Sequence, residues 1–340
     1  MVKLFYYEYV KLIIIKGLVI INTIEVDPSS NYVIGWLNFY NIFWIRINSK
    51  AKFTRLPSSI RISNQENKRC KIKVEGQNIN ISKIKSVWFR RTPEYMNFDF
   101  ELKIDKNLKD RIERNVINEA NAFYNYFISL LIKKKTLGNP NIHNLNKINQ
   151  LEIAIECRLK VPETIITNQK KGIVKFFNKY NKIIIKPLHN IAFHKTNEKY
   201  FIPYTKLFRK SEIDRLPPDF KPCLIQRYIE KKYELRSFFL SGQFYTMAIF
   251  SQDNKQTSID FRAYDEIKPN RVIPYKLPND IQNKLRAFMK KYKLNTGSFD
   301  LIHTKNNDYI FLEVNPAGQF GMVSHPCNYF LEKKIAQYLV

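Results

Sequence analysis

Between Asp105 and Lys135, apolar residues recur at steps of three to four positions, which is the period of an amphipathic helix. This apolar stripe consists of Leu108, Ile112, Val116, Ala120, Phe123, Phe127 and Leu131. Asp105 stands just before the stripe and is expected to cap the helix, because its carboxylate can accept from the first free backbone N–H groups. The string LGNP follows and breaks the helical pattern. The sequence therefore predicts one long helix that ends before this turn.

The residues from about Gly17 to Glu94 show a different pattern, in which short apolar runs alternate with polar turns. LVIINTIEV, FWIRIN and SVWFRR read as strands, and IGWLNFY reads as a short helix. We expect an α/β domain here, with LVIINTIEV as its first strand. Residues 1–16 then form an N-terminal extension or reflect a misassigned start.

The second half of the chain also alternates between the two periods. A helix is predicted from Lys147 to about Arg158, and strands are predicted around Ile183 and Leu224. RSFFLSGQFYTMAIF follows as a hairpin with Ser241 and Gly242 at its two-residue turn. The predicted organisation is an α/β (α+β) protein with an extension at 1–16, an N-terminal domain at 17–138, a small lobe at 139–228 and a C-terminal lobe at 229–340.

Two short strands near the C-terminus carry polar side chains where apolar ones are usual. Asp300 lies inside GSFDLIHT, and Glu313 and Asn315 lie inside YIFLEVN. Glu313 and Asn315 are two positions apart and share one face of a strand, and a hairpin brings Asp300 beside them. Carboxylate and amide oxygens suit a hard divalent ion, so the sequence predicts a Mg²⁺ site. The alternative is a pair of ordinary strands with solvent-facing acids.

An aspartate on one strand followed by E-x-N on the next resembles the end of the ATP-grasp ligases. The resemblance extends upstream, from about Asn139 to the C-terminus. It implies an ATP-grasp fold, preceded by the N-terminal α/β domain as a pre-ATP-grasp domain. It also implies that Lys147 and Lys186 reach the phosphates of ATP.

Between the two lysines and the acids, LIQRYIE followed by YELR resembles the family's interlobe hinge. By this resemblance, Glu234 holds the ribose hydroxyls and Arg236 faces a phosphate or the reacting carboxyl group. The hinge that holds adenine then comprises Gln226, Arg227, Tyr228 and Ile229.

Three longer strings resemble a narrower group, the graspetide maturases related to the microviridin enzymes, and within it the grasp-with-spasm subgroup. They are SVWFRRTPEY, IDFRAYD and the ending EVNPAGQFGMVSHPCNYFLEKKIA. The first contains Trp88, Arg90 and Arg91, which domain folding explains as well as substrate contact does. The second contains Arg262, which together with Arg236 is expected to face a phosphorylated carboxylate, because a guanidinium matches such oxygens bidentately.

This resemblance implies ATP and Mg²⁺ as cofactors and a ribosomally made precursor peptide as the partner. The peptide has a leader and a core rich in acidic and hydroxyl side chains. Its Glu or Asp side chains are activated as acyl phosphates and condensed with Ser or Thr hydroxyls, or with Lys amines, into macrocycles. An ATP-grasp ligase that adds amino acids to a protein or peptide terminus is an alternative. The sequence leaves open whether the enzyme is a homodimer.

One segment departs from the family pattern. After Lys186, many ATP-grasp proteins carry a glycine-rich loop whose N–H groups approach phosphates, whereas this chain has KPLHNIAFHK without glycine. Either the loop is short and rigid, or His189, Asn190 and His194 provide polar contacts. Two histidines without nearby cysteines do not indicate zinc.

The composition fits a globular enzyme of several lobes. The chain has 340 residues, 44% of them hydrophobic, which is enough for a large core. Its 4 cysteines are scattered and indicate neither a disulfide framework nor a zinc ribbon, so a cytoplasmic location is expected. The apolar run LIIIKGLVII is broken by Lys16, and we expect neither a membrane span nor a signal peptide.

The formal net charge of +27 supports a competing interpretation, a basic nucleic-acid-binding protein without ATP chemistry. However, the lysines are spread along a chain that is also rich in Asn and Ile, so a codon bias explains the charge. Attraction of an acidic peptide is a further explanation. No nucleic-acid module accompanies the charge, and we expect no nucleic acid as partner.

Overall fold

The computed structural model describes residues 17–48, 71–74, 77–91, 105–142, 145–188, 194–195, 200–201, 205–263 and 265–340. The predicted extension at 1–16 and the loop residues His189 and Asn190 lie outside this part of the chain. The chain divides into two compact units, Met1–His143 with Phe330–Val340 and Asn144–Tyr329. Among the described helices, none combines the length and apolar character that a membrane crossing requires.

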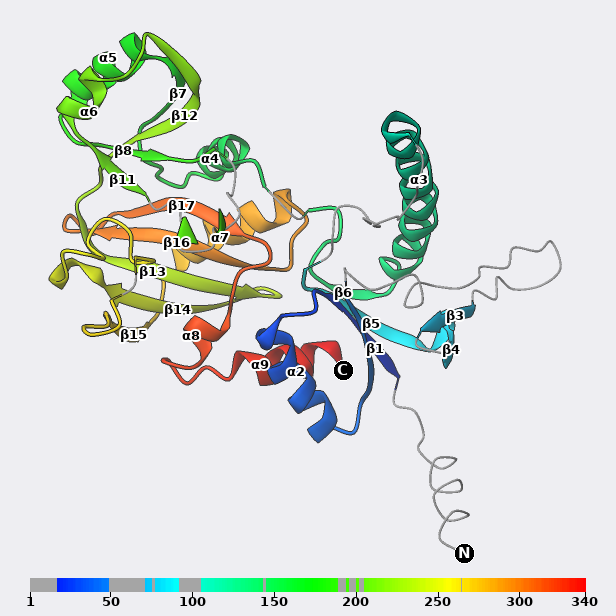
Figure 1. Cartoon of the computed structure of the whole chain (residues 1–340). Helices are drawn as coiled ribbons and strands as arrows, with labels where there is room; N and C mark the ends of the chain where they lie inside the picture. Colours follow the sequence, from blue (N-terminus) through cyan, green and yellow to red (C-terminus); the bar gives the residue numbers. More distant parts are fainter. Residues whose placement is uncertain are drawn as a thin grey trace, which may run out of the picture. The chain divides into compact units, whose positions relative to one another are not determined.

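The first unit is built on a parallel sheet in the order β2-β1-β5-β6 (Figure 1). The strands of this sheet are β1 (Leu18–Thr23), β2 (Phe43–Asn48), β5 (Ile84–Phe89) and β6 (Lys135–Leu137). Helix α2 (Pro28–Phe39) lies between β1 and β2 in the chain, and α3 (Lys106–Leu131) between β5 and β6. A small antiparallel pair, β3 (Lys71–Val74) and β4 (Gln77–Asn80), is followed by the 3-10 turn η2 (Ile81–Lys83).

The first strand is fully buried along its length, as expected for an inner strand of a parallel sheet. One face of the sheet packs against the C-terminal half of α3 through Tyr124, Phe127 and Leu131. The last helix, α9 (Leu331–Leu339), lies beside α2 (Figure 1), and the Oγ of Ser86 donates to the carbonyl of Leu339 at 2.5 Å. The last helix thus belongs to the first unit, whereas the sequence placed it with the C-terminal lobe.

The long predicted helix is confirmed as α3. Asp105 is its N-cap, and its Oδ1 accepts from the backbone N–H groups of Asn107 at 3.0 Å and Leu108 at 3.2 Å. The helix ends at Leu131, four residues earlier than the periodicity suggested, because Lys135–Leu137 forms the edge strand β6. A three-residue strand is too short for a period-2 pattern to reveal.

The second unit contains a small antiparallel sheet in the order β11-β8-β12-β7. Its strands are β7 (Thr164–Gln169), β8 (Ile183–Lys186), β11 (Lys206–Phe208) and β12 (Asp219–Arg227). Helices α5 (Lys170–Tyr180) and α6 (Lys210–Asp214) lie next to this sheet (Figure 1). They pack on it through Ile173 and Ile213, which are fully buried. The short pair β9 (His194–Lys195) and β10 (Tyr200–Phe201) is antiparallel. We refer to this part as the small lobe.

A larger antiparallel sheet follows in the same unit, in the order β15-β14-β13-β16-β17. Its strands are β13 (Lys231–Leu240), β14 (Gln243–Phe250), β15 (Arg271–Tyr275), β16 (Thr296–Thr304) and β17 (Tyr309–Asn315). The elements around it are α4 (Lys147–Glu156), the 3-10 turn η3 (Ser251–Asp253), α7 (Asn279–Lys291) and α8 (Gly321–Ser324). Phe288 of α7 packs against Phe299 and Phe311 of the sheet, with ring centroids 5.9 and 5.1 Å away.

The predicted hairpin and the helix from Lys147 are both confirmed. Ser241 and Gly242 form the turn with φ of 44° and 94°, the left-handed conformation that such turns require. Helices α5 and α7 were missing from the sequence interpretation. For α7 a signal was available, since Ile281, Leu285 and Phe288 follow the helical period and all are buried.

Candidate active site

Three charged side chains lie in one row across the larger sheet. The register pairs Arg236 of β13 with Asp300 of β16, and Asp300 in turn with Glu313 of β17. The Nη1 of Arg236 lies 2.6 Å from each carboxylate oxygen of Asp300. Two like charges at directly paired positions destabilise a sheet unless cations surround them. This arrangement is therefore one that folding alone does not favour.

A β-bulge puts Glu313 into this row. The pairing of β16 with β17 shifts by one residue between Asp300 and Leu301, which leaves Leu312 as the extra residue of β17. As a result, Phe311 and Val314 are both buried although they are three positions apart in a strand. The bulge thus keeps the core contacts of β17 while Glu313 stands opposite Asp300.

The two lysines expected at the phosphates both act on Glu313. Lys147 is the first residue of α4, directly after the N-cap Asn146, and its Nζ lies 3.4 Å from Oε2 of Glu313. A cation at a helix N-terminus opposes the helix dipole, so its position is not explained by helix stability. Lys186 ends β8, and burial lowers its pKa, although the charge of Glu313 opposes this.

The two carboxylates respond differently to these surroundings. Burial outweighs Arg236 at Asp300 and raises the pKa of its carboxyl group, with Glu313 adding to the increase. At Glu313, burial acts in the same sense, but Lys147, Lys186 and Arg262 together lower the pKa of the carboxyl group. Adjacent acids whose pKa values shift in opposite directions are common in functional sites, because such shifts fit the acids to different chemical roles and folding does not require them.

Asn315 is the last residue of β17, two positions after Glu313, and it pairs with Ser298 of β16. Its Oδ1 accepts from the backbone N–H of Ala317 at 3.0 Å, and its carbonyl accepts from Gly318 at 3.0 Å. A Cβ on Gly318 would lie 2.2 Å from the Oγ of Ser298. Only glycine permits the turn after Asn315 to pass this close to β16.

The expected hinge lies at the end of β12. Gln226 is buried and its Nε2 donates to Oγ1 of Thr164 at 3.0 Å, while its Oε1 is a buried acceptor without a hydrogen-bond partner among the described residues. Arg227, the next residue, lies on the opposite face of the strand, with its Cζ 5.6 Å from the ring centroid of Tyr180. The backbone N–H of Tyr228 donates to the carbonyl of Lys182 at 2.9 Å, and Ile229 follows in the connection to β13.

Glu234 is already engaged with neighbours that sequence reasoning missed. Its Oε1 accepts from Lys231 Nζ at 2.6 Å and from Ser251 Oγ at 2.8 Å, and Lys231 also donates to the carbonyl of Ile259 at 3.2 Å. Burial raises the pKa of Glu234 despite these contacts. A bulge in β13 between Lys231 and Tyr233 brings Lys231 and Glu234 together, and no periodic pattern would show that.

Arg262 lies in the segment after η3 and forms a bidentate pair with Asp260. Its Nε lies 2.9 Å from Oδ1 and its Nη2 lies 2.6 Å from Oδ2. Asp260 is a further residue that the sequence did not single out. The hydrogen bonds and the charge of Asp260 raise the pKa of Arg262, and the charges of Glu313 and Asp300 add to this increase, so Arg262 belongs to the same charged cluster.

The donor set fits a hard divalent ion that also contacts phosphate. Among the described residues, no three His, Cys, Asp or Glu side chains come together as a metal-binding group. Asp300, Glu313 and Asn315 instead offer two carboxylates and an amide, which suits Mg²⁺ because this ion takes one or two carboxylates and fills its remaining positions with phosphate and water. The surrounding lysines and arginines suit the phosphates themselves.

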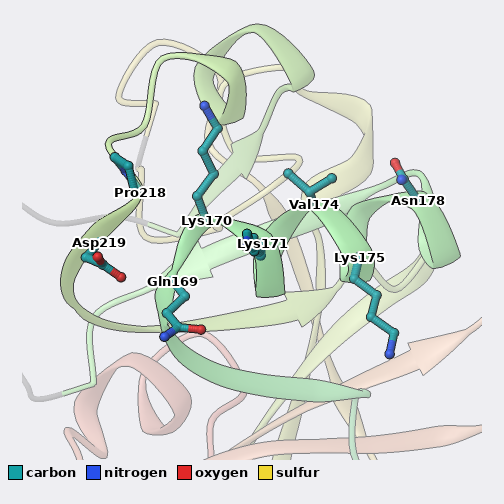
Figure 2. A pocket seen from close by; sticks show the side chains of 8 residues that line it. All are labelled: Gln169, Lys170, Lys171, Val174, Lys175, Asn178, Pro218 and Asp219. Carbon is teal, nitrogen blue, oxygen red and sulfur yellow. The ribbon is translucent and has the colours of Figure 1, made fainter.

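One arginine from the sequence analysis lies outside this cluster. Arg90, at the end of β5, is buried in the first unit with its Nε 3.6 Å from Oδ2 of Asp27, and burial lowers its pKa to about 10. A hollow of about 780 Å³ lies on the small lobe of the second unit. Figure 2 shows the side chains that line it, which include Lys170, Lys171, Val174 and Lys175 of α5. None of the predicted site residues lines this hollow.

The comparisons with known proteins agree with this architecture. Residues 19–144 match the family model described as the MvdD pre-ATP grasp domain. Macrocyclase MdnC of Microcystis aeruginosa MRC, solved with precursor peptide MdnA, is 25% identical with a TM-score of 0.75, covering 95% of this chain and 99% of that chain. No match was found among curated proteins.

Two further solved structures share the fold at lower identity. An ATP-grasp ligase of Chryseobacterium gregarium, described as RiPP-associated and bound to ADP and a leader and core peptide, is 22% identical with a TM-score of 0.78 and covers 95% of both chains. ATP-grasp ligase PsnB with minimal precursor, Mg and ADP is 16% identical with a TM-score of 0.66, over 94% of this chain and 96% of that one.

The fold of this chain is that of the ATP-grasp ligases, and residues 19–144 match the pre-ATP-grasp domain, which indicates an ATP-dependent ligase. Its likeness to solved peptide macrocyclases supports a place among the peptide maturases of the graspetide type. The likeness supports the peptide-maturase interpretation over the amino-acid ligase and the nucleic-acid-binding protein.

Proposed function

We propose that this chain joins side chains of a ribosomal precursor peptide into macrocycles at the expense of ATP. The observation that carries the proposal is the row Arg236, Asp300 and Glu313, in which two acids are paired directly and Lys147 and Lys186 act on one of them. The likeness to solved macrocyclases bound to precursor peptides supports a peptide as the substrate. The grasp-with-spasm subgroup stays a prediction.

Each residue of the cluster has a proposed role in binding. Lys147 and Lys186 contact the phosphates of ATP, and Gln226 to Ile229 hold adenine, for which the unpaired Oε1 of Gln226 is an available acceptor. Glu234 holds the ribose hydroxyls. Asp300, Glu313 and Asn315 would hold Mg²⁺, which supplies charge neutralisation at the phosphates when bound.

The proposed reaction has two steps. An oxygen of a Glu or Asp carboxylate of the peptide attacks the γ-phosphorus of ATP, and the bond to the β-phosphate oxygen breaks, which gives an acyl phosphate and ADP. A Ser or Thr hydroxyl, or a Lys amine, of the same peptide then attacks the carbonyl carbon. Phosphate leaves, the proton of the nucleophile is lost to phosphate or solvent, and an ester or amide closes the ring.

The protein contributes positioning and electrostatic stabilisation to these steps. Arg236 and Arg262 face the carboxylate that becomes phosphorylated, since planar guanidinium groups match its oxygens. The lysines neutralise charge that moves from the γ-phosphate toward ADP. Because this chemistry needs no covalent enzyme intermediate, the chain requires no nucleophilic triad. We place the reaction in the cytoplasm, where ATP and a newly made peptide are both present.

The test is intact-mass analysis of a candidate precursor peptide after incubation with enzyme, ATP and magnesium. The proposal expects losses equal to whole numbers of water molecules, one for each ring. Glu313→Ala should give no loss, whereas Asp308→Asn, which changes an exposed acid at the turn of the same hairpin, should behave like the wild type. ATP consumption that depends on free amino acids, with an unchanged peptide mass, would contradict the proposal.

A further inference from the structure

Asp260 accepts four hydrogen bonds, and they come from two different parts of the second unit. Three come from Arg262, namely its Nε at 2.9 Å, its Nη2 at 2.6 Å and its backbone N–H at 3.1 Å. The fourth comes from the backbone N–H of Thr205, at 2.9 Å, which is 55 positions earlier in the chain. Both carboxylate oxygens therefore accept hydrogen bonds. Oδ1 accepts from Arg262 alone, and Oδ2 accepts from Arg262 and from Thr205 beside the small-lobe strand β11.

The contact with Thr205 connects Asp260 with the strand pair that carries Lys186, a lysine proposed to bind phosphate. Thr205 immediately precedes β11, whose first residue, Lys206, pairs with Ile185 of β8. Ile185 is the neighbour of Lys186, the last residue of β8. The charge of Asp260 acts on Lys186, as do those of Arg262 and Glu313. Asp260 thus stands between an arginine proposed to contact the substrate carboxylate and a lysine proposed to contact ATP.

The energetics indicate that Asp260 is held ionised in this position. Its side chain is only 6% exposed, and burial opposes its charge, but the hydrogen bonds and charge of Arg262 and the N–H of Thr205 lower its pKa to about 2. Its partner Arg262 is half exposed, so the open side of the guanidinium faces away from Asp260. A buried acid that orients a half-exposed arginine is a common arrangement for preorganising a binding group.

We propose that Asp260 is a positioning residue that fixes the guanidinium of Arg262 and ties it to the small-lobe strand pair β8/β11. The inference rests on the proposed function for the part that concerns catalysis. In the proposed arrangement, Asp260 does not touch the reacting atoms. It holds Arg262 toward the peptide carboxylate and, through Thr205, keeps the strand that carries Lys186 in register with it.

The first readout needs no turnover. Hydrogen–deuterium exchange of the backbone amides of Thr205 and Arg262 is measured in the wild type, Asp260→Ala and Asp265→Asn, without nucleotide. Loss of a hydrogen bond to a charged acceptor should speed exchange of both amides by roughly tenfold in Asp260→Ala. Asp265 is the matched control, because it lies in the same segment but accepts from Asn254 Nδ2 and from the backbone N–H groups of Ile267 and Lys268. Unchanged exchange in Asp260→Ala overturns the inference.

The second readout is a double-mutant cycle on kcat/KM with the precursor peptide. Asp260→Ala and Arg262→Ala should each lower it by roughly a hundredfold, and the loss in the double variant should be far smaller than the product of the two, because Asp260 acts mainly through Arg262. Asp260→Asn keeps the volume and one acceptor for Thr205, so a fold defect is separated from loss of charge. Multiplied losses in the double variant contradict the inference. If the wild type does not turn over any peptide, the proposed function fails, and the exchange result still decides the Asp260 contacts.

Discussion

Arg236 and Asp300 form an ion pair inside the larger sheet, with the single nitrogen Nη1 of the arginine 2.6 Å from each carboxylate oxygen and side-chain exposures of only 10% and 15%. The sequence resemblance implies that Arg236 faces a phosphate or the reacting carboxyl group, and the sequence pattern predicts that Asp300 holds a metal ion. The pairing shows that each also supports the other. Neither charge is stable at this depth alone, because removal of one partner leaves the other desolvated and unpaired.

The first prediction concerns this pair. Arg236→Met and Asp300→Asn should each destabilise the protein by roughly 3 kcal/mol, and the double variant should lose less than the sum. Urea unfolding at neutral pH measures the free energies. The exposed pair Lys160 and Asp308 is the control, where Asp308→Asn should cost less than about 1 kcal/mol. Additive losses at Arg236 and Asp300 would show that the pairing contributes no coupling energy.

The second prediction concerns Glu313 as a metal ligand. Glu313→Gln removes a negative charge but keeps the volume, so turnover should fall by roughly a thousandfold as charge neutralisation at the phosphates is lost. A higher magnesium requirement should accompany the loss. ADP release across a magnesium titration measures both, and circular dichroism checks the fold. Wild-type turnover at ordinary magnesium would remove Glu313 from the metal site.

The third prediction is a pH dependence at Lys186. Because burial lowers the pKa of Lys186, its ammonium should lose its proton at a pH below the ordinary lysine value, and affinity for ATP should weaken as pH rises through that point. Lys186→Arg keeps its charge and should shift this alkaline limb upward. Titration of ATP binding between neutral and alkaline pH measures it. Lys182→Arg, at an exposed lysine just before β8, should leave the limb in place.

The fourth prediction concerns acid stability and Asp260. Its pKa of about 2 lies below the ordinary value of roughly 3.9, so its stabilisation is fully present above that ordinary value and is lost as pH falls toward 2. Asp260→Asn should therefore cost roughly 2 kcal/mol at pH 7, and clearly less at about pH 3. Urea unfolding at several pH values checks this. A cost that does not change with pH would mean that the charge of Asp260 is not what stabilises the fold.

The fifth prediction concerns the turn after Asn315. Gly318→Ala places a Cβ 2.2 Å from the Oγ of Ser298, so one strand must move and the protein should lose about 1–3 kcal/mol. Turnover should fall with it, because Asn315 and Gly318 share a hydrogen bond. Gly35→Ala is the control, since nothing lies within 4 Å of its Cβ and alanine favours the helix. Thermal unfolding and ADP release measure both variants. Equal stability of the two would contradict the close approach.

Much of the site could be predicted because its residues sit in local patterns. The strands that carry Asp300 and Glu313 have apolar neighbours and turn residues that mark them in the sequence, and the helix that Lys147 begins is visible from its period. The order of these elements along the chain matched that of a known fold, which was enough to suggest nucleotide, metal and substrate class. The sequence by itself determined the strands and the helix that carry Asp300, Glu313 and Lys147, and the side chains that these elements present.

The tertiary structure decided which of these side chains meet. Bulges at Leu312 and between Lys231 and Tyr233 shift the strand registers by one residue, and a shift of one residue changes which face a side chain occupies. The partners of Asp260 include the backbone N–H of Thr205, which is 55 positions away in the sequence. The last helix belongs to the first unit, although the whole second unit separates them in the sequence. Such contacts depend on how strands pair over long distances, and local periodicity carries no information about that pairing.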